Sequence, residues 1–106
     1  MPSPLPSLTA EQRAQALAKA ARVRKERGAM LSSLKAGDIS LLDALARKDE
    51  TTGRTRVLSL LQSLPGIGPV RAKRTLLELG IAETRRVQGL GERQRRLLID
   101  RFPPHQ

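Results

Sequence analysis

Apolar positions recur along the chain at the three- and four-residue spacing of helices, in short blocks that glycine and proline separate. No segment shows the sustained two-residue alternation that is typical of a half-buried strand. The pattern therefore predicts an all-α fold with a long N-terminal helix followed by a compact domain of about four short helices. We expect a flexible leader over residues 1–8, the long helix over residues 9–36 and the compact domain over residues 37–106.

The long helix should begin after Thr9, which has the capping-box spacing with Gln12, and should end at Gly37. The sequence does not decide whether the helix continues through Gly28, because glycine costs ~1 kcal/mol of helix propensity. The apolar face of its earlier turns is thin, and only Met30, Leu31 and Leu34 in the last turns are expected to anchor the helix to the core. The earlier turns are expected to lie largely exposed. They present basic residues that could face solvent or make auxiliary phosphate contacts: Arg13, Lys19, Arg22, Arg24, Lys25 and Arg27.

Capping residues, glycines and prolines divide the rest of the chain into short elements. Ser40 and Asp43 have a second capping-box spacing, and Leu64 is pushed out of the helical region by the proline that follows it. Pro69 is well placed as the first residue of a helix. The expected helices are residues 41–48, 55–63, 69–79 and 92–102, with a polar turn at 49–53 and at most one helical turn at 82–87.

The composition narrows the classes of function. The 106-residue chain has 20 Lys and Arg against 10 Asp and Glu, a formal net charge of +10, which predicts a polyanionic partner. It has no Cys, one His at position 105 and one aromatic residue, Phe102. Thiolate metal sites, a Ser-His-Asp triad and base stacking on aromatic rings are therefore disfavoured. No apolar run has the length of a membrane helix and no secretory signal is recognisable, so we expect a cytoplasmic protein.

The most informative segment is residues 58–77, where an apolar helix ends before Pro65 and the next begins at Pro69. Gly66 and Gly68 permit positive φ in the turn between them, and Ala72 lets the two helices approach closely. We expect this turn to aim backbone N–H groups outward at the positive end of a helix, as a site for a phosphate oxygen. Pro69 has no N–H, so the expected donors are Gly66, Ile67, Gly68, Val70 or Arg71. Positive charge around the turn comes from Arg71, Lys73 and Arg74.

This segment resembles the helix–hairpin–helix motif of proteins that hold the DNA backbone without reading bases; the alternative is an ordinary turn between helices. The following run, with Arg85-Arg86-Val87 and Gly89-Leu90-Gly91, resembles a helix–two-turns–helix. From Leu8 to Phe102 the chain is similar to actinobacterial integration host factor. The resemblance implies a small nucleoid-associated protein that binds duplex DNA with little sequence preference and bends, loops or compacts it. It leaves open a recombinase or integrase as a partner on shared DNA.

The resemblance also implies particular DNA-binding residues. The glycine-rich hairpin of the family falls on residues 65–70, and its basic pair before the third helix falls on Arg54 and Arg56. A second patch falls on residues 85–88, where Gln88 replaces a usual arginine, as Pro69 replaces a usual lysine; the alternative for Arg85 and Arg86 is a solvated pair. The expected DNA-binding residues are Arg54, Arg56, Pro65, Gly66, Ile67, Gly68, Val70, Arg71, Lys73, Arg74, Arg85, Arg86 and Gln88.

Two other classes of function compete with DNA architecture. A small-subunit ribosomal protein with a helix–two-turns–helix also has a Gly-Ile-Gly hairpin, but it usually continues into a long basic C-terminal extension. Hairpins of this type also occur in DNA glycosylases, which would make Lys73 with Glu78 or Glu83 a candidate catalytic group. A chain of this length cannot build a base-flipping pocket beside the hairpin. We therefore expect no enzymatic activity, no cofactor and no metal, and a monomer located in the nucleoid.

Overall fold

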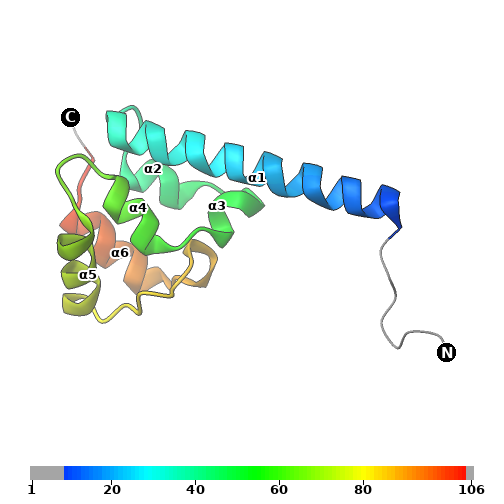
Figure 1. The fold of residues 1–106 in the computed structure, drawn as a ribbon. Coiled ribbons are helices and arrows are strands. Elements are labelled where there is room, and N and C mark those ends of the chain that lie inside the picture. Colours follow the sequence, from blue (N-terminus) through cyan, green and yellow to red (C-terminus); the bar gives the residue numbers. More distant parts are fainter. Residues whose placement is uncertain (1–8, 105–106) are drawn as a thin grey trace.

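The computed structural model describes residues 9–104, and its helices confirm the all-α prediction. The expected leader, residues 1–8, and His105 lie outside this range. Within it, the helices in chain order are α1 Ala10–Ala36, α2 Leu41–Ala46, α3 Glu50–Arg54, α4 Val57–Ser63, α5 Pro69–Glu78, the short 3₁₀ helix η1 Val87–Gly89 and α6 Glu92–Arg101. The five shorter α-helices pack together beneath one end of α1 (Figure 1).

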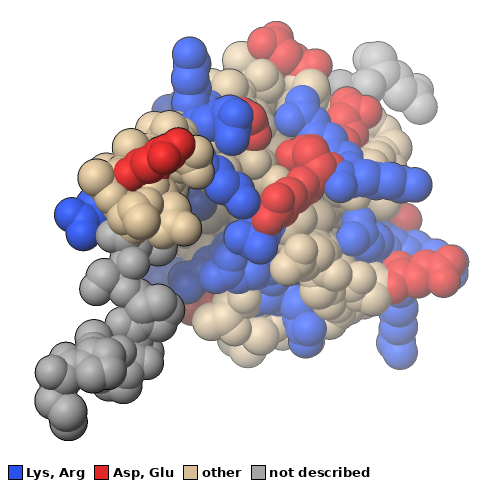
Figure 2. All heavy atoms as spheres, turned by 90° about the vertical axis from the view of Figure 1, so that its right-hand side faces the viewer, with Lys and Arg blue, Asp and Glu red and all other residues tan. Residues whose placement is uncertain are grey.

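Helix α1 is a long arm whose first half projects away from the other helices (Figure 1). The capping box is present, with Thr9 and Gln12 exchanging two hydrogen bonds of 3.0 Å. The helix passes through Gly28 without a break and ends at Gly37, which has a φ of 80°. Seen toward the free end of this helix, Lys and Arg side chains gather beneath it (Figure 2). The arm projects because its early turns carry too little apolar surface to pack on the domain, as the sequence pattern predicted.

The core lies between the last turns of α1 and the short helices. Met30 and Leu34 are its contribution from α1, whereas Leu31 is only half-buried. Ala72 is completely buried where α4 packs on α5, so its small side chain allows the close approach expected from the sequence. The largest fully buried side chains are Leu34, Leu41, Leu60, Leu61, Leu76 and Leu98. This core fixes the turn between α4 and α5 and the segment before η1.

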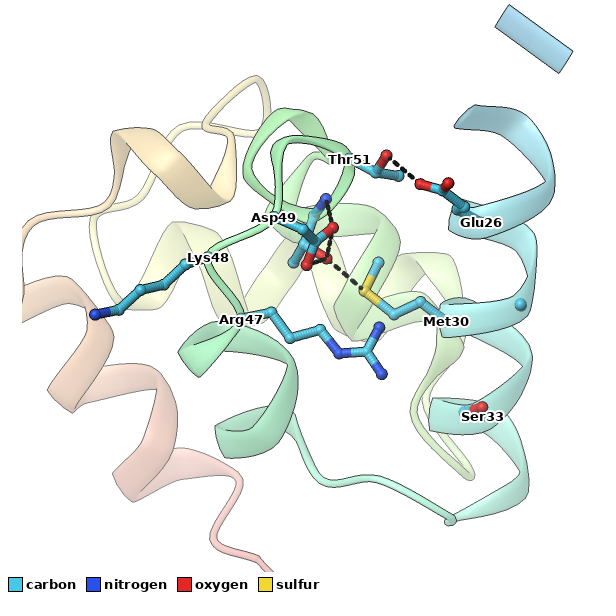
Figure 3. A pocket seen from close by; sticks show the side chains of 9 residues that line it. Glu26, Met30, Ser33, Arg47, Lys48, Asp49 and Thr51 are labelled. Atoms are coloured by element: carbon cyan, nitrogen blue, oxygen red, sulfur yellow. Dashed lines mark hydrogen bonds between the residues drawn. The ribbon is translucent and has the colours of Figure 1, made fainter. Parts of the chain in front are cut away.

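The prediction of a polar turn at residues 49–53 was wrong, because residues 50–53 belong to α3 and Asp49 is its N-cap. The Asp49 carboxylate caps the helix: it accepts hydrogen bonds from the backbone N–H and from the hydroxyl of Thr52, each at 2.9 Å. The hydroxyl of Thr51 donates to Glu26 Oε2 at 2.8 Å, and the Thr52 hydroxyl lies 3.4 Å from Met30 Sδ (Figure 3). Polar residues that are typical of turns thus attach α3 to α1, an arrangement that local sequence does not reveal.

The segment after α3 also differs from the prediction. Thr55 and Arg56 are extended, with ψ near 140°, so α4 begins at Val57 instead of Thr55. Helix α2 ends at Ala46, two residues earlier than expected. Because Thr55 and Arg56 are extended, this segment can form backbone hydrogen bonds with residues 85–87.

We expect Asp49→Ala to lower the free energy of unfolding by ~1 kcal/mol, because it removes the cap of α3. Asp49→Ser keeps a capping oxygen and is the matched control, with a smaller expected loss. Urea unfolding followed by circular dichroism measures both values.

The same cap gives a pH dependence with a definite sign. The backbone N–H of Thr52 holds the pKa of Asp49 below its ordinary value of 3.8. Its stabilising contribution is therefore complete well above pH 3.8 and is lost as the pH falls through the lowered pKa. The stability difference between the native chain and Asp49→Ala should shrink below pH 3.8; a difference that stays constant in acid would contradict the role of this carboxylate.

Candidate nucleic-acid interface

The turn between α4 and α5 is built from a proline and one left-handed glycine. Ile67 N–H donates to Leu64 O at 3.1 Å, which places Pro65 and Gly66 at the centre of a β-turn. Gly66 has a φ of 75°, as the third residue of a type II β-turn requires. Gly68 has a φ of −93° and a ψ of 178°, so only Gly66 adopts the positive φ that both glycines permit. A Cβ at Gly68 would meet nothing within 4 Å, so the fold itself does not require glycine there.

The turn leaves a group of backbone donors open at the start of α5; we call this group the hairpin nest. It consists of the N–H groups of Gly66, Gly68, Val70 and Arg71, for which no residue in the described range supplies an acceptor. Ile67 N–H is not part of it, contrary to expectation, because it closes the β-turn. The half-buried Ile67 side chain instead packs against the core and holds the turn in place. Unpaired N–H groups at the positive end of a helix form an anion-binding site.

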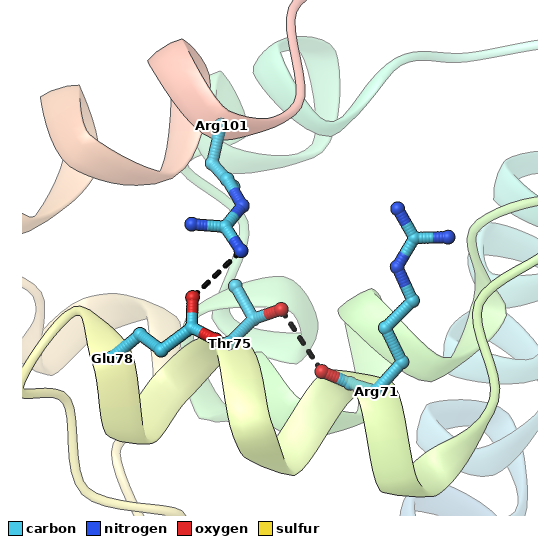
Figure 4. Close-up of polar contacts among 4 residues, drawn as sticks. All are labelled: Arg71, Thr75, Glu78 and Arg101. Atoms are coloured by element: carbon cyan, nitrogen blue, oxygen red, sulfur yellow. Dashed lines mark hydrogen bonds and ion pairs between the residues drawn. The ribbon is translucent and has the colours of Figure 1, made fainter.

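The basic residues that follow the nest point in different directions. Arg71 extends from the first turn of α5 with no partner drawn at its guanidinium, whereas Arg101 pairs with Glu78 at 2.7 Å (Figure 4). Lys73 and Arg74 line a separate shallow hollow with the exposed side chains of Val70 and Leu77. Of the three basic residues expected beside the nest, Arg71 is therefore the one placed on the same turn of helix as its donors.

A second basic surface, which we call the arginine hollow, is assembled from three distant segments. It is lined by Arg27, Leu31, Arg54, Thr55, Arg56, Ser59 and Arg86, with no acidic side chain among them. Arg54 is also paired with Glu50 at 2.8 Å, but both side chains are more than half exposed, so this bond is weak and replaceable. A hollow lined by four arginines is the kind of surface that attracts phosphate oxygens.

A short antiparallel bridge holds the arginine hollow together. Val57 N–H donates to Arg85 O at 2.9 Å, and Val87 N–H donates to Thr55 O at 3.0 Å. Because side chains alternate along extended backbone, Val57 and Val87 are buried while Arg56 and Arg86 are exposed. Arg86 Nη1 also donates to the backbone oxygen of Arg54 at 2.9 Å, which connects Arg54 directly to the bridge between Arg56 and Arg86.

The second predicted patch, residues 85–88, is divided between different surfaces. Arg86 lies in the arginine hollow, whereas Arg85 turns toward η1 and donates to Gly89 O at 3.2 Å. Gln88 packs beside Gly53 of α3 and lines another hollow with Arg95. Arg95 is a structural residue: it is half-buried and its guanidinium donates to Leu45 O at 2.7 Å and Val87 O at 2.9 Å.

Sequence reasoning gave Arg27 no special place, although it lines the arginine hollow. Its signal was weak but present, because Arg27 lies four residues before Leu31 and so shares its face of α1. What the sequence lacked was any indication that this face meets Arg54, Arg56 and Arg86.

The comparison with known proteins gives this geometry a context. A family model described as S13-like H2TH domain matches residues 34–102. Integration host factors from Mycobacterium tuberculosis and Mycolicibacterium smegmatis are each 47% identical over 100 residues, which cover 92% of this chain and 95% of theirs. The integration host factor of Streptomyces coelicolor is 48% identical over 92 residues, covering 85% of this chain and 86% of that protein. This chain belongs to the integration host factor family.

A member of the family has been solved with nucleic acid. The structure of sIHF bound to an 8-base-pair palindromic DNA superposes with a TM-score of 0.78 at 42% sequence identity, covering 79% of this chain and 97% of that chain. The resemblance to this family that the sequence motifs indicated is therefore confirmed, together with its all-α architecture. Within residues 9–104, no helix combines the length and apolar character needed to cross a membrane, and no cluster of His, Asp and Glu could hold a metal.

Proposed function

We propose that this chain is a nucleoid-associated architectural protein that binds duplex DNA through the phosphate backbone and bends or compacts it. The observation that carries the proposal is the placement of the hairpin nest and the arginine hollow at opposite ends of α4. This seven-residue helix is ~10 Å long, which is comparable to the groove widths of B-DNA, about 6 to 12 Å. A separation of this order matches the spacing of the two phosphate strands that border one groove.

The groups in these surfaces favour phosphate contact over base reading. The nest offers backbone N–H groups, which bind any phosphate oxygen, and the hollow offers arginines, whose planar forks match phosphate geometry. We assign phosphate contact to Arg54, Arg56 and Arg86 through their side chains and to Gly66, Gly68, Val70 and Arg71 through backbone N–H groups. Pro65 and Ile67 shape the turn. Lys73, Arg74, Arg85 and Gln88 lie outside both surfaces and remain predicted contacts at their margins.

The same observations weigh against the other two classes of function. Relatives at 47% identity that cover nearly the whole chain are named integration host factors, which favours DNA over ribosomal RNA as the partner. We also infer that the chain is not an enzyme. Of the acidic groups considered for catalysis, Glu78 is paired with Arg101 at 2.7 Å, and Glu83 lines a hollow with Lys73 in which both side chains are exposed. Chromosomal DNA as the partner implies a location in the nucleoid.

A direct test compares a duplex of about 20 base pairs with its separated strands and with an RNA hairpin of the same length, by fluorescence anisotropy. We expect at least about tenfold tighter binding to the duplex, because single-strand binding draws about 1–3 kcal/mol per base from aromatic stacking. This chain has one aromatic residue, Phe102, and it packs against the core. Equal affinity for a single strand would contradict duplex binding, and tighter binding to the RNA hairpin would favour the ribosomal alternative.

A further inference from the structure

We propose that the outward side of α5 is a docking surface for an acidic amphipathic helix of another protein. This surface is formed by Val70, Lys73, Arg74 and Leu77, and we call it the α5 face. The inference goes beyond duplex binding, because it assigns a protein partner to a surface that lies outside the hairpin nest and the arginine hollow.

The two most exposed large apolar side chains of residues 9–104 lie on the α5 face. Val70 is 71% exposed and Leu77 is 81% exposed. At 3.6 residues per turn, residues seven positions apart lie almost in line, ~10 Å from each other along the helix. Single apolar residues are ordinary on protein surfaces, but apolar residues that lie together on one face are typical of a contact surface.

Two cations flank this apolar line. Lys73 and Arg74 lie between the two apolar residues along the helix, one on each side of the line that joins them. No ion pair in the described part of the chain includes either cation, although Glu83 lines the same hollow. Their aliphatic stems extend the apolar surface, while their charged ends stay in water at its margins. The α5 face therefore has an apolar centre with positive charge on both sides.

The α5 face is held in place by the core behind it. Ala72, Thr75 and Leu76 are buried on the opposite side of α5. Beyond the end of the helix, Ile81 N–H donates to Leu76 O at 2.9 Å, which brings Ile81 and Ala82 to the edge of the hollow. The helix lies at the edge of the domain, on the side away from the free end of α1 (Figure 1). A partner would thus meet a surface that is already formed.

The chemistry of the α5 face matches an acidic amphipathic helix. Such a helix carries apolar residues at i, i+3, i+4 and i+7, so two of them can lie along the apolar line of α5. Acidic residues beside its apolar stripe would meet Lys73 and Arg74, which gives the contact complementary charge. A phosphate strand would also pair with the cations, but it would leave Val70 and Leu77 in water.

Charge also weighs against a second copy of the chain as the partner. The chain has a formal net charge of +10, so two copies repel each other. A symmetric contact through α5 would in addition set the same two cations against each other.

The α5 face adjoins the hairpin nest. Val70 supplies its backbone N–H to the nest and its side chain to the face. A protein docked on the α5 face would therefore be held beside a duplex that is bound at the nest.

The experiment uses a fluorescein-labelled helical peptide of about 16 residues, with leucines along one side and glutamates beside them. Two matched peptides separate charge from apolar contact: one has lysine in place of glutamate, and the other has alanine in place of leucine. We expect the acidic leucine peptide to bind the native chain at least about tenfold more tightly than either, as measured by fluorescence anisotropy. Equal binding of the leucine and alanine peptides would overturn the inference, because charge alone would then explain the attraction.

Two exposed leucines supply matched variants. Leu77→Gln removes part of the apolar centre of the α5 face, whereas Leu17→Gln makes the same change at a residue of α1 that is 65% exposed. Glutamine is a good helix former, so both variants should keep the native circular dichroism signal. Leu77→Gln should weaken binding of the acidic leucine peptide by about tenfold and leave duplex affinity within about twofold of native. Leu17→Gln should change peptide affinity by less than about twofold.

Charge reversal tests the flanking cations. Lys73→Glu with Arg74→Glu should remove the preference for the glutamate peptide over the lysine peptide, and a preference that persists would overturn the inference. Equal losses of peptide affinity in the two leucine variants would overturn it as well. If Leu77→Gln weakened duplex binding as much as peptide binding, the face would belong to DNA. If sedimentation showed a dimer that this variant dissociates, the face would belong to a second copy, and either result would overturn the inference.

Discussion

Gly68→Val is expected to weaken duplex binding by about a hundredfold while lowering the free energy of unfolding by no more than ~1 kcal/mol, the cost of replacing an N-cap glycine of α5. Gly68 has an extended backbone and open space around an added Cβ, so valine fits the fold. Its methyl groups would, however, occupy the open space beside the Gly68 N–H, where a phosphate bound at the hairpin nest would approach. Anisotropy titrations and thermal unfolding measure the two quantities, and native affinity in this variant would show that the nest is not a contact.

A valine at the neighbouring Gly66 should also weaken duplex binding, but the cause is backbone strain. Gly66 has a φ of 75°, which a β-branched residue adopts only at a cost of at least ~1–2 kcal/mol. Gly66→Val should therefore lower both stability and affinity. Gly80 has a φ of 71° at the far end of α5 and supplies the matched control. Gly80→Val should lose similar stability and keep its affinity; a parallel loss of affinity in both variants would mean that strain alone explains the effect.

Arg56→Ala combined with Arg86→Ala is expected to weaken binding to every duplex by about thirty- to a hundredfold. These side chains meet in the arginine hollow, and phosphate contacts carry no base information, so the loss should be the same on unrelated sequences. The salt slope should become shallower by about two units. Because Arg86 also bonds to Arg54 O, the variant must be checked for native stability.

The control for the hollow removes two charges elsewhere on the surface. Arg93 and Arg96 are exposed on α6, and Arg96 makes only a long ion pair of 3.9 Å with Glu92. Arg93→Ala with Arg96→Ala should cost less than about threefold in affinity. Arg85→Ala should also cost less than Arg86→Ala, because Arg85 is turned toward Gly89. An Arg56 and Arg86 double variant that behaves like the α6 control would remove the hollow from the interface.

The parts of this fold that could be predicted are those set by short-range chemistry. The two capping boxes, the stop at Gly37 and the start of α5 at Pro69 each depend on residues within one turn of helix, and all four are present. Helix α3 was missed for the same reason. Its polar residues satisfy turn rules locally, and their partners Glu26 and Met30 are more than 20 residues away.

The same distinction between short-range and long-range contacts separates the predictable from the unpredictable parts of the candidate site. The hairpin nest follows from a Pro-Gly turn before a helix, so the sequence predicted its place, but not that Ile67 N–H is used internally or that Gly68 is extended. The arginine hollow depends on the bridge between Arg56 and Arg86 and on the side of α1 that faces it. Such pairings between distant segments leave no periodic signal, which is why Arg27 was not singled out from the other basic residues of α1 and Arg85 was grouped with Arg86.

The most direct test of phosphate-backbone binding is the salt dependence of affinity for two unrelated duplexes of about 20 base pairs, one rich in A·T and one rich in G·C. With three to five phosphates neutralised by the arginines of the hollow and by Arg71 beside the nest, log affinity should fall with log salt at a slope of about −3 to −4.5. The slopes on the two duplexes should agree, and their affinities should lie within about tenfold of each other. A slope shallower than about −1, or an affinity that depends on sequence by more than about a thousandfold, would contradict the account.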